Sequence, residues 1–198
     1  MMNDPDPDLD LDLDKLKRLA RDAGALRIAY ADPPYLGNSV KRYGDHPNAA
    51  EYDTLEGHKA LIGRLQGFDG WALSMASTNL RELLPYCPAD ARVMAWVKPF
   101  AIFKPNVNPA YAWEPVIVKP ARRLGRDVPT SRDWVSVNIT LRKGVVGAKP
   151  KAFSMWLFQV LGMRVGDEFV DLFPGSGSVA DAYAEWLEGP KEDDDAQS

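Results

Sequence analysis

Apolar positions follow two patterns along the chain. Short continuous apolar runs, typical of strands buried inside a parallel sheet, alternate with longer stretches in which apolar residues recur every three or four positions, as on one face of a helix. The apolar runs predict strands over residues 26–31, 71–75, 92–97, 114–118, 134–141 and 168–173. The periodic stretches predict helices over residues 12–23, 55–65, 79–86, 149–161 and 179–187. This alternation predicts an α/β sandwich with a mostly parallel sheet and helices on both faces.

Some segments depart from this pattern. Residues 36–54 are polar and lack periodicity, and a loop of this length beside a site usually has a function. Pro115 cannot donate to a neighbouring strand, which favours an edge position for the strand over residues 114–118. Residues 1–11 alternate Asp with Pro or Leu, and residues 191–198 are also acidic, so we expect two disordered acidic tails around one domain over residues 12–190.

Charge is distributed unevenly. The net charge of the chain is −4, but residues 15–190 hold 23 basic and 18 acidic side chains. A basic insertion over about residues 119–147 suggests a polyanionic partner such as nucleic acid, with a solvated Arg-rich loop as the alternative. The candidate nucleic-acid contacts are Arg122, Arg123, Arg126, Arg132 and Lys143.

Composition excludes several classes of protein. One Cys rules out a disulfide framework, and with only two His residues, His46 and His58, it argues against a closed zinc site. Loop and surface-helix positions explain both histidines. No apolar run approaches the roughly 20 residues that cross a bilayer, and no signal peptide is evident. We therefore expect no membrane association, no metal and a cytoplasmic location, in a bacterium or a phage-infected cell.

Two turns concentrate the candidate chemistry. The first, Asp32-Pro33-Pro34-Tyr35, directly follows the strand over residues 26–31. Two prolines end the strand there and leave a carboxylate and an aromatic ring at its C-terminal end, where open α/β sheets bind ligands. The second turn, Phe173-Pro174-Gly175-Ser176-Gly177, follows the strand over residues 168–173. We expect the two turns to be neighbours in space and to form one active site.

The second turn has the form of a nucleotide cradle. Gly175 to Ala180 fits G-x-G-x-x-A between a strand and a helix, and its glycines allow a ligand to approach the backbone closely. No Gly-Lys-Ser/Thr follows, which excludes a Walker phosphate loop, and no further strand with an acidic residue follows, which argues against NAD. The alternative is a tight turn without a ligand.

Together these motifs resemble the amino-group methyltransferases that use S-adenosylmethionine. The D-P-P-Y turn precedes the F-x-G-x-G turn, which is the circularly permuted order of the beta class of DNA adenine methyltransferases and of the related mRNA adenosine methyltransferases. Lys149-Pro150 matches a lysine-proline element of that group. The resemblance spans about residues 26–188 and implies a Rossmann-like methyltransferase fold that is circularly permuted and C-terminally short, since the family's next strand, with its acidic ribose ligand, is missing.

The order of the motifs also separates this group from its competitors. Protein-glutamine methyltransferases use an N-P-P-Y turn with the glycine turn upstream, and cytosine-N4 enzymes usually have serine in place of Asp32. The resemblance therefore implies transfer of a methyl group to the N6 amino group of adenine in DNA. RNA adenosine methylation is one alternative. A non-catalytic nucleic-acid-binding subunit is another, and a homodimer or a partner subunit is open.

The resemblance also assigns roles to residues. The catalytic turn comprises Asp32, Pro33, Pro34 and Tyr35. In it, Asp32 and the Pro33 carbonyl would hold the two amino hydrogens of the target base, and Tyr35 would stack on the base. The residues expected to bind S-adenosylmethionine are Asp32, Lys149, Asp171, Phe173, Gly175, Ser176 and Gly177, with Lys149 pairing to the methionine carboxylate.

Overall fold

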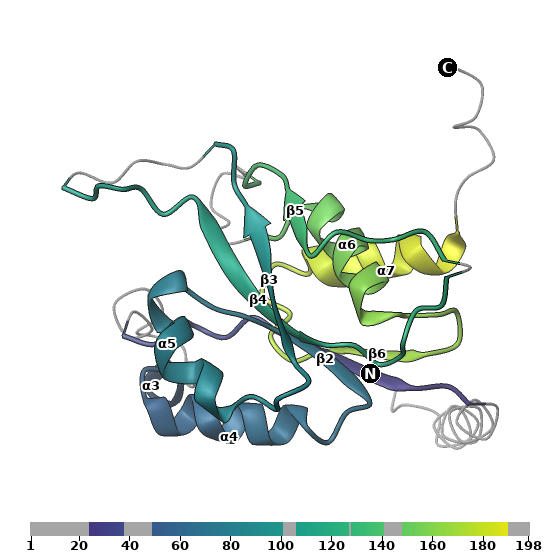
Figure 1. Ribbon diagram of the computed structural model, residues 1–198, viewed down its shortest axis with the longest axis horizontal. Helices are drawn as coiled ribbons and strands as arrows, with labels where there is room; N and C mark the ends of the chain where they lie inside the picture. Colours follow the sequence, from purple (N-terminus) through teal and green to yellow (C-terminus); the bar gives the residue numbers. More distant parts are fainter. Residues whose placement is uncertain (1–23, 38–48, 101–105, 127, 141–147, 190–198) are drawn as a thin grey trace, which may run out of the picture.

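The computed structural model describes residues 24–37, 49–100, 106–126, 128–140 and 148–189. In this part of the chain, six strands form one sheet in the order β5-β3-β4-β2-β1-β6 (Figure 1). The strands are β1 (Arg27–Ala31), β2 (Gly70–Ser74), β3 (Arg92–Val97), β4 (Trp113–Lys119), β5 (Trp134–Ser136) and β6 (Glu168–Asp171). All run in one direction except β4, which is antiparallel to both neighbours. The expected mostly parallel sheet is confirmed.

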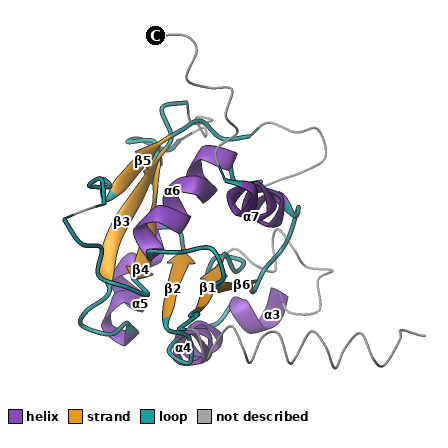
Figure 2. Cartoon of the chain, turned by 90° about the vertical axis from the view of Figure 1, so that its right-hand side faces the viewer, coloured by secondary structure: helices purple, strands orange, loops and turns teal. Residues whose placement is uncertain are grey.

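Helices cover both faces of the sheet. α6 (Lys151–Leu161) and α7 (Ser178–Glu188) lie on one face. α3 (Ala49–Tyr52), α4 (Leu55–Leu65) and α5 (Leu80–Leu83) lie on the other, as the two orthogonal views show (Figures 1 and 2). The α/β sandwich predicted from the sequence is therefore confirmed.

Each face of the sheet has its own apolar core, because successive residues of a strand point to opposite faces. On the α6–α7 side, Tyr30 and Trp96 pack against Phe153 and other buried residues of α6. On the α3–α5 side, Trp71 and Leu73 pack with residues of α4. β1 and β2 are buried almost completely, as expected for central parallel strands.

Local sequence signals explain where the helices begin and end. Thr54 caps α4, since its hydroxyl accepts a hydrogen bond from the Gly57 amide at 3.1 Å. Pro150 precedes α6, and Gly162, with a φ of 71°, ends it in the left-handed conformation that favours glycine. The predicted helices over residues 55–65, 149–161 and 179–187 agree with α4, α6 and α7 to within two residues.

The structure corrects the expectation that residues 114–118 form an edge strand. β4 lies inside the sheet, between β3 and β2. Pro115 is tolerated there because it lies opposite Met75, one residue beyond the end of β2. Its carbonyl accepts a hydrogen bond from the Met75 amide at 3.2 Å, and the donor that proline lacks would fall outside the β2 ladder.

Other expectations are refined. The predicted helix over residues 79–86 is instead α5 flanked by two short 3₁₀ turns, η1 (Ser77–Asn79) and η2 (Leu84–Tyr86). The strand over residues 134–141 is shorter and ends at Ser136. Within the expected loop over residues 36–54, residues 49–52 form α3. The expected helix over residues 12–23, both acidic tails and His46 lie outside the described residues.

The surface position expected for His58 is wrong. Its side chain is buried beneath α3, with its ring edge-on to Tyr52 and its Nδ1 3.2 Å from the Thr54 carbonyl oxygen. Burial lowers the pKa of His58. The histidine is thus part of the packing between α3 and α4.

Gly70 gives a test of the packing between β2 and the segment after β4. A Cβ added at Gly70 would lie 2.4 Å from the backbone nitrogen of Ala121, which cannot move aside as a flexible side chain could. We expect Gly70→Ala to lower the free energy of unfolding by about 2–3 kcal/mol because overpacking forces backbone shifts. Urea unfolding measures this, with Gly63→Ala in α4 as the control, since open space surrounds that position. Equal stability of the two variants would contradict the close approach.

Candidate active site

The two turns predicted from the sequence lie side by side. β1 and β6 are adjacent parallel strands, with Tyr30 opposite Asp171, and the Leu172 amide donates to the Tyr30 carbonyl oxygen at 2.9 Å. The Asp32 turn follows β1 and the glycine turn follows β6, so both emerge at the same edge of the sheet. This is the edge formed by the C-terminal ends of the parallel strands, where ligands bind in open α/β sheets.

Asp32 belongs to a cluster of ionisable side chains at this edge. The Lys149 ammonium lies 2.8 Å from Asp32 Oδ2 and 3.6 Å from Glu114 Oε2. The Lys149 side chain is only 6% exposed, and its ammonium lies 5.2 Å from the centre of the Trp96 ring. A buried ammonium needs ionised partners, and here two carboxylates share it, one from the turn after β1 and one from β4.

Tyr35 and Lys98 complete the cluster. The Tyr35 hydroxyl lies 2.8 Å from Glu114 Oε2 and 3.3 Å from Asp32 Oδ1. Lys98, at the end of β3, pairs with the other oxygen of Glu114. Two carboxylates and two ammonium groups therefore balance in charge, and Tyr35 is oriented by both carboxylates.

The pKa values in the cluster reflect burial and mutual attraction. Burial raises the pKa of Asp32, and Lys149 opposes this only in part. Burial would also raise the pKa of Glu114, but Lys149 and Lys98 outweigh it, so the pKa is below its ordinary value. Burial would lower the pKa of Lys149, but Asp32 and Glu114 outweigh it, so the pKa is raised. Glu114 therefore stays ionised to lower pH than Asp32, and Asp32 is the more basic of the two carboxylates.

Tyr35 remains a phenol. Burial and then the charges of Asp32 and Glu114 raise the pKa of Tyr35 well above its ordinary value. The side chain can donate a hydrogen bond and offer a flat ring, but it cannot act as a base near neutral pH.

The glycine turn has the open backbone that the sequence predicts. Gly175 and Gly177 have φ angles of 45° and 77°, which other residues rarely adopt. Among the described residues, nothing lies within 4 Å of the position that a Cβ of Gly177 would occupy. Gly177 leads directly into α7, whose first amide groups therefore face the turn.

The other residues predicted around this turn lie close to it. The Asp171 side chain accepts a hydrogen bond from the Phe173 amide through Oδ1 at 3.1 Å. Asp171 Oδ2 is buried and has no hydrogen-bond partner in the described part of the chain. Burial raises the pKa of Asp171. The Phe173 ring packs edge-on against Tyr52 of α3, and Ser176 is exposed with its hydroxyl 3.2 Å from that of Ser178.

Three residues that the sequence analysis did not assign to the site help to build it. Ser178, the first residue of α7, accepts a hydrogen bond from the Lys149 amide at 3.2 Å and so ties Lys149 to the glycine turn. Glu114 and Lys98 are the other two. Both are charged residues at the ends of apolar strand segments, and that position was the signal, because such side chains lie at a sheet edge.

The predicted nucleic-acid contacts lie elsewhere. Arg122 follows the C-terminal end of β4, which is at the opposite edge of the sheet from Asp32 because β4 is antiparallel. Its guanidinium pairs with both carboxylate oxygens of the buried Asp167, at 2.5 and 2.7 Å. Asp167 also accepts hydrogen bonds from the amides of Leu26 and Arg164. Arg122 therefore has a structural partner at that edge.

The other basic residues are more exposed or lie outside the description. Arg123 follows Arg122 at the same edge, Arg126 is exposed, and the Arg132 guanidinium lies 5.1 Å from the centre of the Trp134 ring. Lys143 lies outside the described residues. A role for these residues in nucleic-acid binding stays a prediction.

Arg122 and Arg123 allow a direct test. Arg122→Met would leave the Asp167 carboxylate buried without its cation, and we expect it to lower the free energy of unfolding by about 2–4 kcal/mol. Arg123→Met, the adjacent control, should change it by less than about 0.5 kcal/mol. Thermal and urea unfolding give both values. Two unaffected proteins would mean that the Arg122–Asp167 pair does not stabilise the fold.

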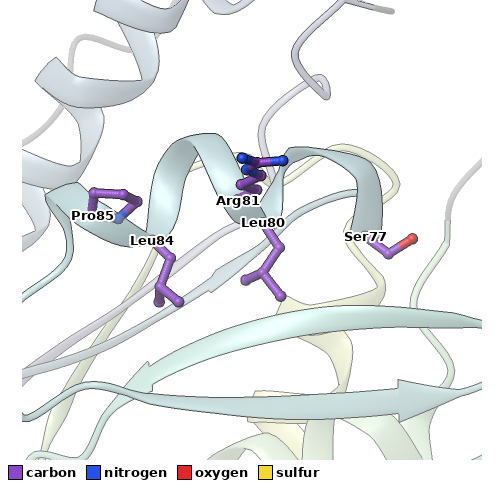
Figure 3. A pocket seen from close by; sticks show the side chains of 5 residues that line it. All are labelled: Ser77, Leu80, Arg81, Leu84 and Pro85. Carbon is purple, nitrogen blue, oxygen red and sulfur yellow. The ribbon is translucent and has the colours of Figure 1, made fainter.

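An open groove lies beside the segment that contains α5. It has a volume of about 550 Å³ and is lined by Ser77, Leu80, Arg81, Leu84 and Pro85, with Leu80 and Leu84 pointing toward the sheet (Figure 3). None of these five residues belongs to the ionisable cluster. The groove and the ionisable cluster therefore share no residue.

The described residues contain no group of three or more His, Cys, Asp or Glu side chains arranged to hold a metal ion. Nor is any helix among them long and apolar enough to cross a membrane.

Comparison with solved structures identifies the fold. The crystal structure of the M1.HpyAVI–SAM complex is similar over 89% of this chain and 86% of that chain, with a TM-score of 0.52 and 16% sequence identity. A crystal structure of M1.HpyAVI matches over 88% of this chain and 83% of that one, with a TM-score of 0.48 and 13% identity. The six-stranded sheet with helices on both faces is thus a methyltransferase fold, as the sequence predicted. No protein-family model matches the sequence, and a search of curated proteins gives no match.

Proposed function

We propose that this protein is an S-adenosylmethionine-dependent methyltransferase that modifies the N6 amino group of adenine in DNA. The observation that supports this best is the placement of the Asp32 turn beside the open glycine turn, at the ligand-binding edge of a methyltransferase fold. The crystal structure of the neighbour M1.HpyAVI is that of its complex with SAM. The order of the turns along the chain, with the Asp32 turn first, supports the circularly permuted arrangement of the beta class.

The residues around the glycine turn fit the cofactor. The positive φ angles of Gly175 and Gly177 and the free space beside Gly177 let a ligand approach the backbone. Asp171 Oδ2, which has no hydrogen-bond partner among the described residues, is a buried acceptor close to the turn, suited to a hydroxyl or an amino group of a ligand. Phe173 would provide an apolar wall. When bound, S-adenosylmethionine would supply a methyl group on a positively charged sulfur, which leaves as a neutral thioether when the amino nitrogen forms the new C–N bond.

Asp32 would supply the main catalytic interaction. An exocyclic amino nitrogen is a weak nucleophile because its lone pair is delocalised into the ring. The Asp32 carboxylate and the Pro33 carbonyl oxygen would accept the two amino hydrogens and so direct the lone pair toward the methyl group. The nitrogen becomes positively charged on methylation and must lose one proton. Asp32, the more basic carboxylate of the cluster, is placed to receive it.

Tyr35 would hold the base in position. Its hydroxyl is fixed by Glu114 and Asp32, so its ring has little freedom to rotate and offers a flat surface beside Asp32. A base in duplex DNA would have to leave the helix to reach it.

Lys149 contacts both Asp32 and Glu114, and through its contact with Asp32 it would influence the catalytic carboxylate. The expected pairing of Lys149 with the methionine carboxylate of the cofactor stays a prediction. It would require the ammonium to bind a third anion in addition to Asp32 and Glu114.

Transfer of a labelled methyl group from S-adenosylmethionine tests the proposal. The purified chain is incubated with unmethylated DNA and, separately, with RNA, and the product nucleosides are separated. N6-methyladenine in DNA is the expected result, whereas label in RNA alone would identify an RNA adenosine methyltransferase. If neither polymer is labelled and calorimetry detects no cofactor binding, the chain acts as a non-catalytic subunit or requires a partner.

A further inference from the structure

Glu114 is the one carboxylate of the cluster to which the reaction itself gives no task. It belongs to β4, which runs in the opposite direction to β1, the strand before Asp32. Its carboxylate contacts three other members of the cluster. Its side chain is 17% exposed, so its charge costs free energy unless it is compensated. We therefore asked what the cluster would lose without this carboxylate.

Without Glu114, Asp32 would be the single carboxylate partner of Lys149 among the residues that the structure describes. A buried ammonium bound to one carboxylate at 2.8 Å draws electron density from that carboxylate and makes it a poorer hydrogen-bond acceptor and a weaker base. With Glu114 present at 3.6 Å, the same ammonium has a second anion to turn to. The distances are short enough for a rotation of the flexible lysine side chain to exchange one partner for the other.

We propose that Glu114 is a positioning residue for Asp32, which shares the Lys149 ammonium and so leaves Asp32 free to accept the amino hydrogens of the substrate. The inference rests on the proposed function, because the need for a free acceptor follows from the chemistry of an amino group. When the amino group engages Asp32, Lys149 transfers its main contact to Glu114. This exchange of partners leaves the net charge of the cluster unchanged.

The described neighbours of Asp32 act in this balance. Lys149 and the Tyr35 hydroxyl stabilise the ionised form of Asp32, whereas burial and the charge of Glu114 oppose it. Asp171 of β6 adds a nearby carboxylate, and Tyr30 of β1 is a neutral phenol that donates to or accepts from Ser74. Lys98 is engaged by Glu114. Loss of the Glu114 charge and loss of the Tyr35 hydroxyl should therefore shift the pKa of Asp32 in opposite directions.

The experiment is a ¹³C NMR titration of the aspartate side-chain carboxyls, with the Asp32 signal assigned from an Asp32→Asn variant. In Glu114→Gln, we expect the titration of Asp32 to move to lower pH by about one unit. In Tyr35→Phe, it should move to higher pH, and in Glu114→Asp, which keeps the charge, it should stay near that of the wild type. Glu168→Gln is the matched control, since Glu168 pairs with Arg27 at the opposite edge of the sheet.

Methyl transfer adds a second measurement. Glu114→Gln should lower kcat about tenfold near neutral pH, with the KM for S-adenosylmethionine changed less than twofold, and should move the acid limb of the pH–rate profile to lower pH. An Asp32 titration that is unchanged, or displaced to higher pH, in a folded Glu114→Gln protein would overturn the inference. Absence of transfer by the wild type would instead refute the proposed function, while the NMR titration would still decide the coupling.

Discussion

Replacement of Asp32 by Asn is expected to abolish methyl transfer while leaving cofactor binding nearly unchanged. Asn has almost the shape of Asp, but it offers one acceptor oxygen in place of two and cannot take up the proton released from the methylated nitrogen. The substitution removes both a preorganised carboxylate that stabilises the developing positive charge and a proton acceptor. Together these losses lower kcat by about 10³–10⁴-fold. Single-turnover transfer measures the rate, and calorimetry with S-adenosylmethionine measures binding, which should stay within about threefold.

Asp133→Asn is the matched control for this prediction. Asp133 is exposed and pairs with Arg92 far from the candidate site. Its replacement should affect neither the rate nor binding. Full activity of the Asp32→Asn variant would show that the site assignment is wrong, and loss of cofactor binding with unchanged folding would move Asp32 from the substrate side to the cofactor side of the pocket.

Replacement of Lys149 by Met is expected to have the largest effect on stability. The variant keeps the length and apolar contacts of the side chain but leaves Asp32 without its cation and Glu114 with Lys98 alone. Removing one partner of a buried ion pair typically costs about 3–5 kcal/mol. We expect a loss of this size at pH 8 in urea unfolding, and loss of methyl transfer with it.

The pH dependence of this loss has a definite sign. In the wild type, the lowered pKa of Glu114 contributes stability that is present above the ordinary carboxyl range and is lost as the pH falls. In Lys149→Met, burial without a cation raises the pKa of Asp32 in the folded state further than in the wild type, so more stability is lost as the pH rises above the ordinary range. The difference between variant and wild type should therefore shrink markedly between pH 8 and pH 4.5.

Lys151 provides the control for the lysine variant. It lies two residues away, is largely exposed and pairs with Glu185 on the surface. Lys151→Met should change the free energy of unfolding by less than about 0.5 kcal/mol at either pH. A Lys149→Met protein as stable as this control would contradict the description of the cluster as a buried, mutually dependent set of charges.

Much of the fold was predictable because local patterns determine it. The apolar runs located β1, β2, β3 and β6, and Gly162 marked the end of α6. The adjacency of the two turns followed from a general property of parallel sheets rather than from any local signal. The interior position of β4 was missed because Pro115 is compatible with it only through the early end of β2, which is a tertiary feature.

The candidate site was predictable in part for a similar reason. The motifs revealed Asp32, Tyr35, Lys149 and the glycines, since these residues are close in sequence to recognisable turns. Glu114 was not revealed, because its place beside Asp32 depends on the pairing of β4 with β2 and on the reversed direction of β4. For the basic residues, the structure adds a contact that charge along the sequence did not indicate: Arg122 pairs with the buried carboxylate of Asp167, while a role of the basic residues in nucleic-acid binding stays a prediction.

The reversed direction of β4 has a consequence for redesign of this protein. Because β3 and β4 are consecutive and antiparallel, Lys98 after the end of β3 and Glu114 near the start of β4 lie at the same end of one hairpin, one on each of its strands. The hairpin therefore contributes no net charge to the cluster. A redesigned hairpin that keeps an acid and a base at these two positions would therefore leave the net charge of the ionisable cluster unchanged, whereas replacement of only one of them would change it by one unit.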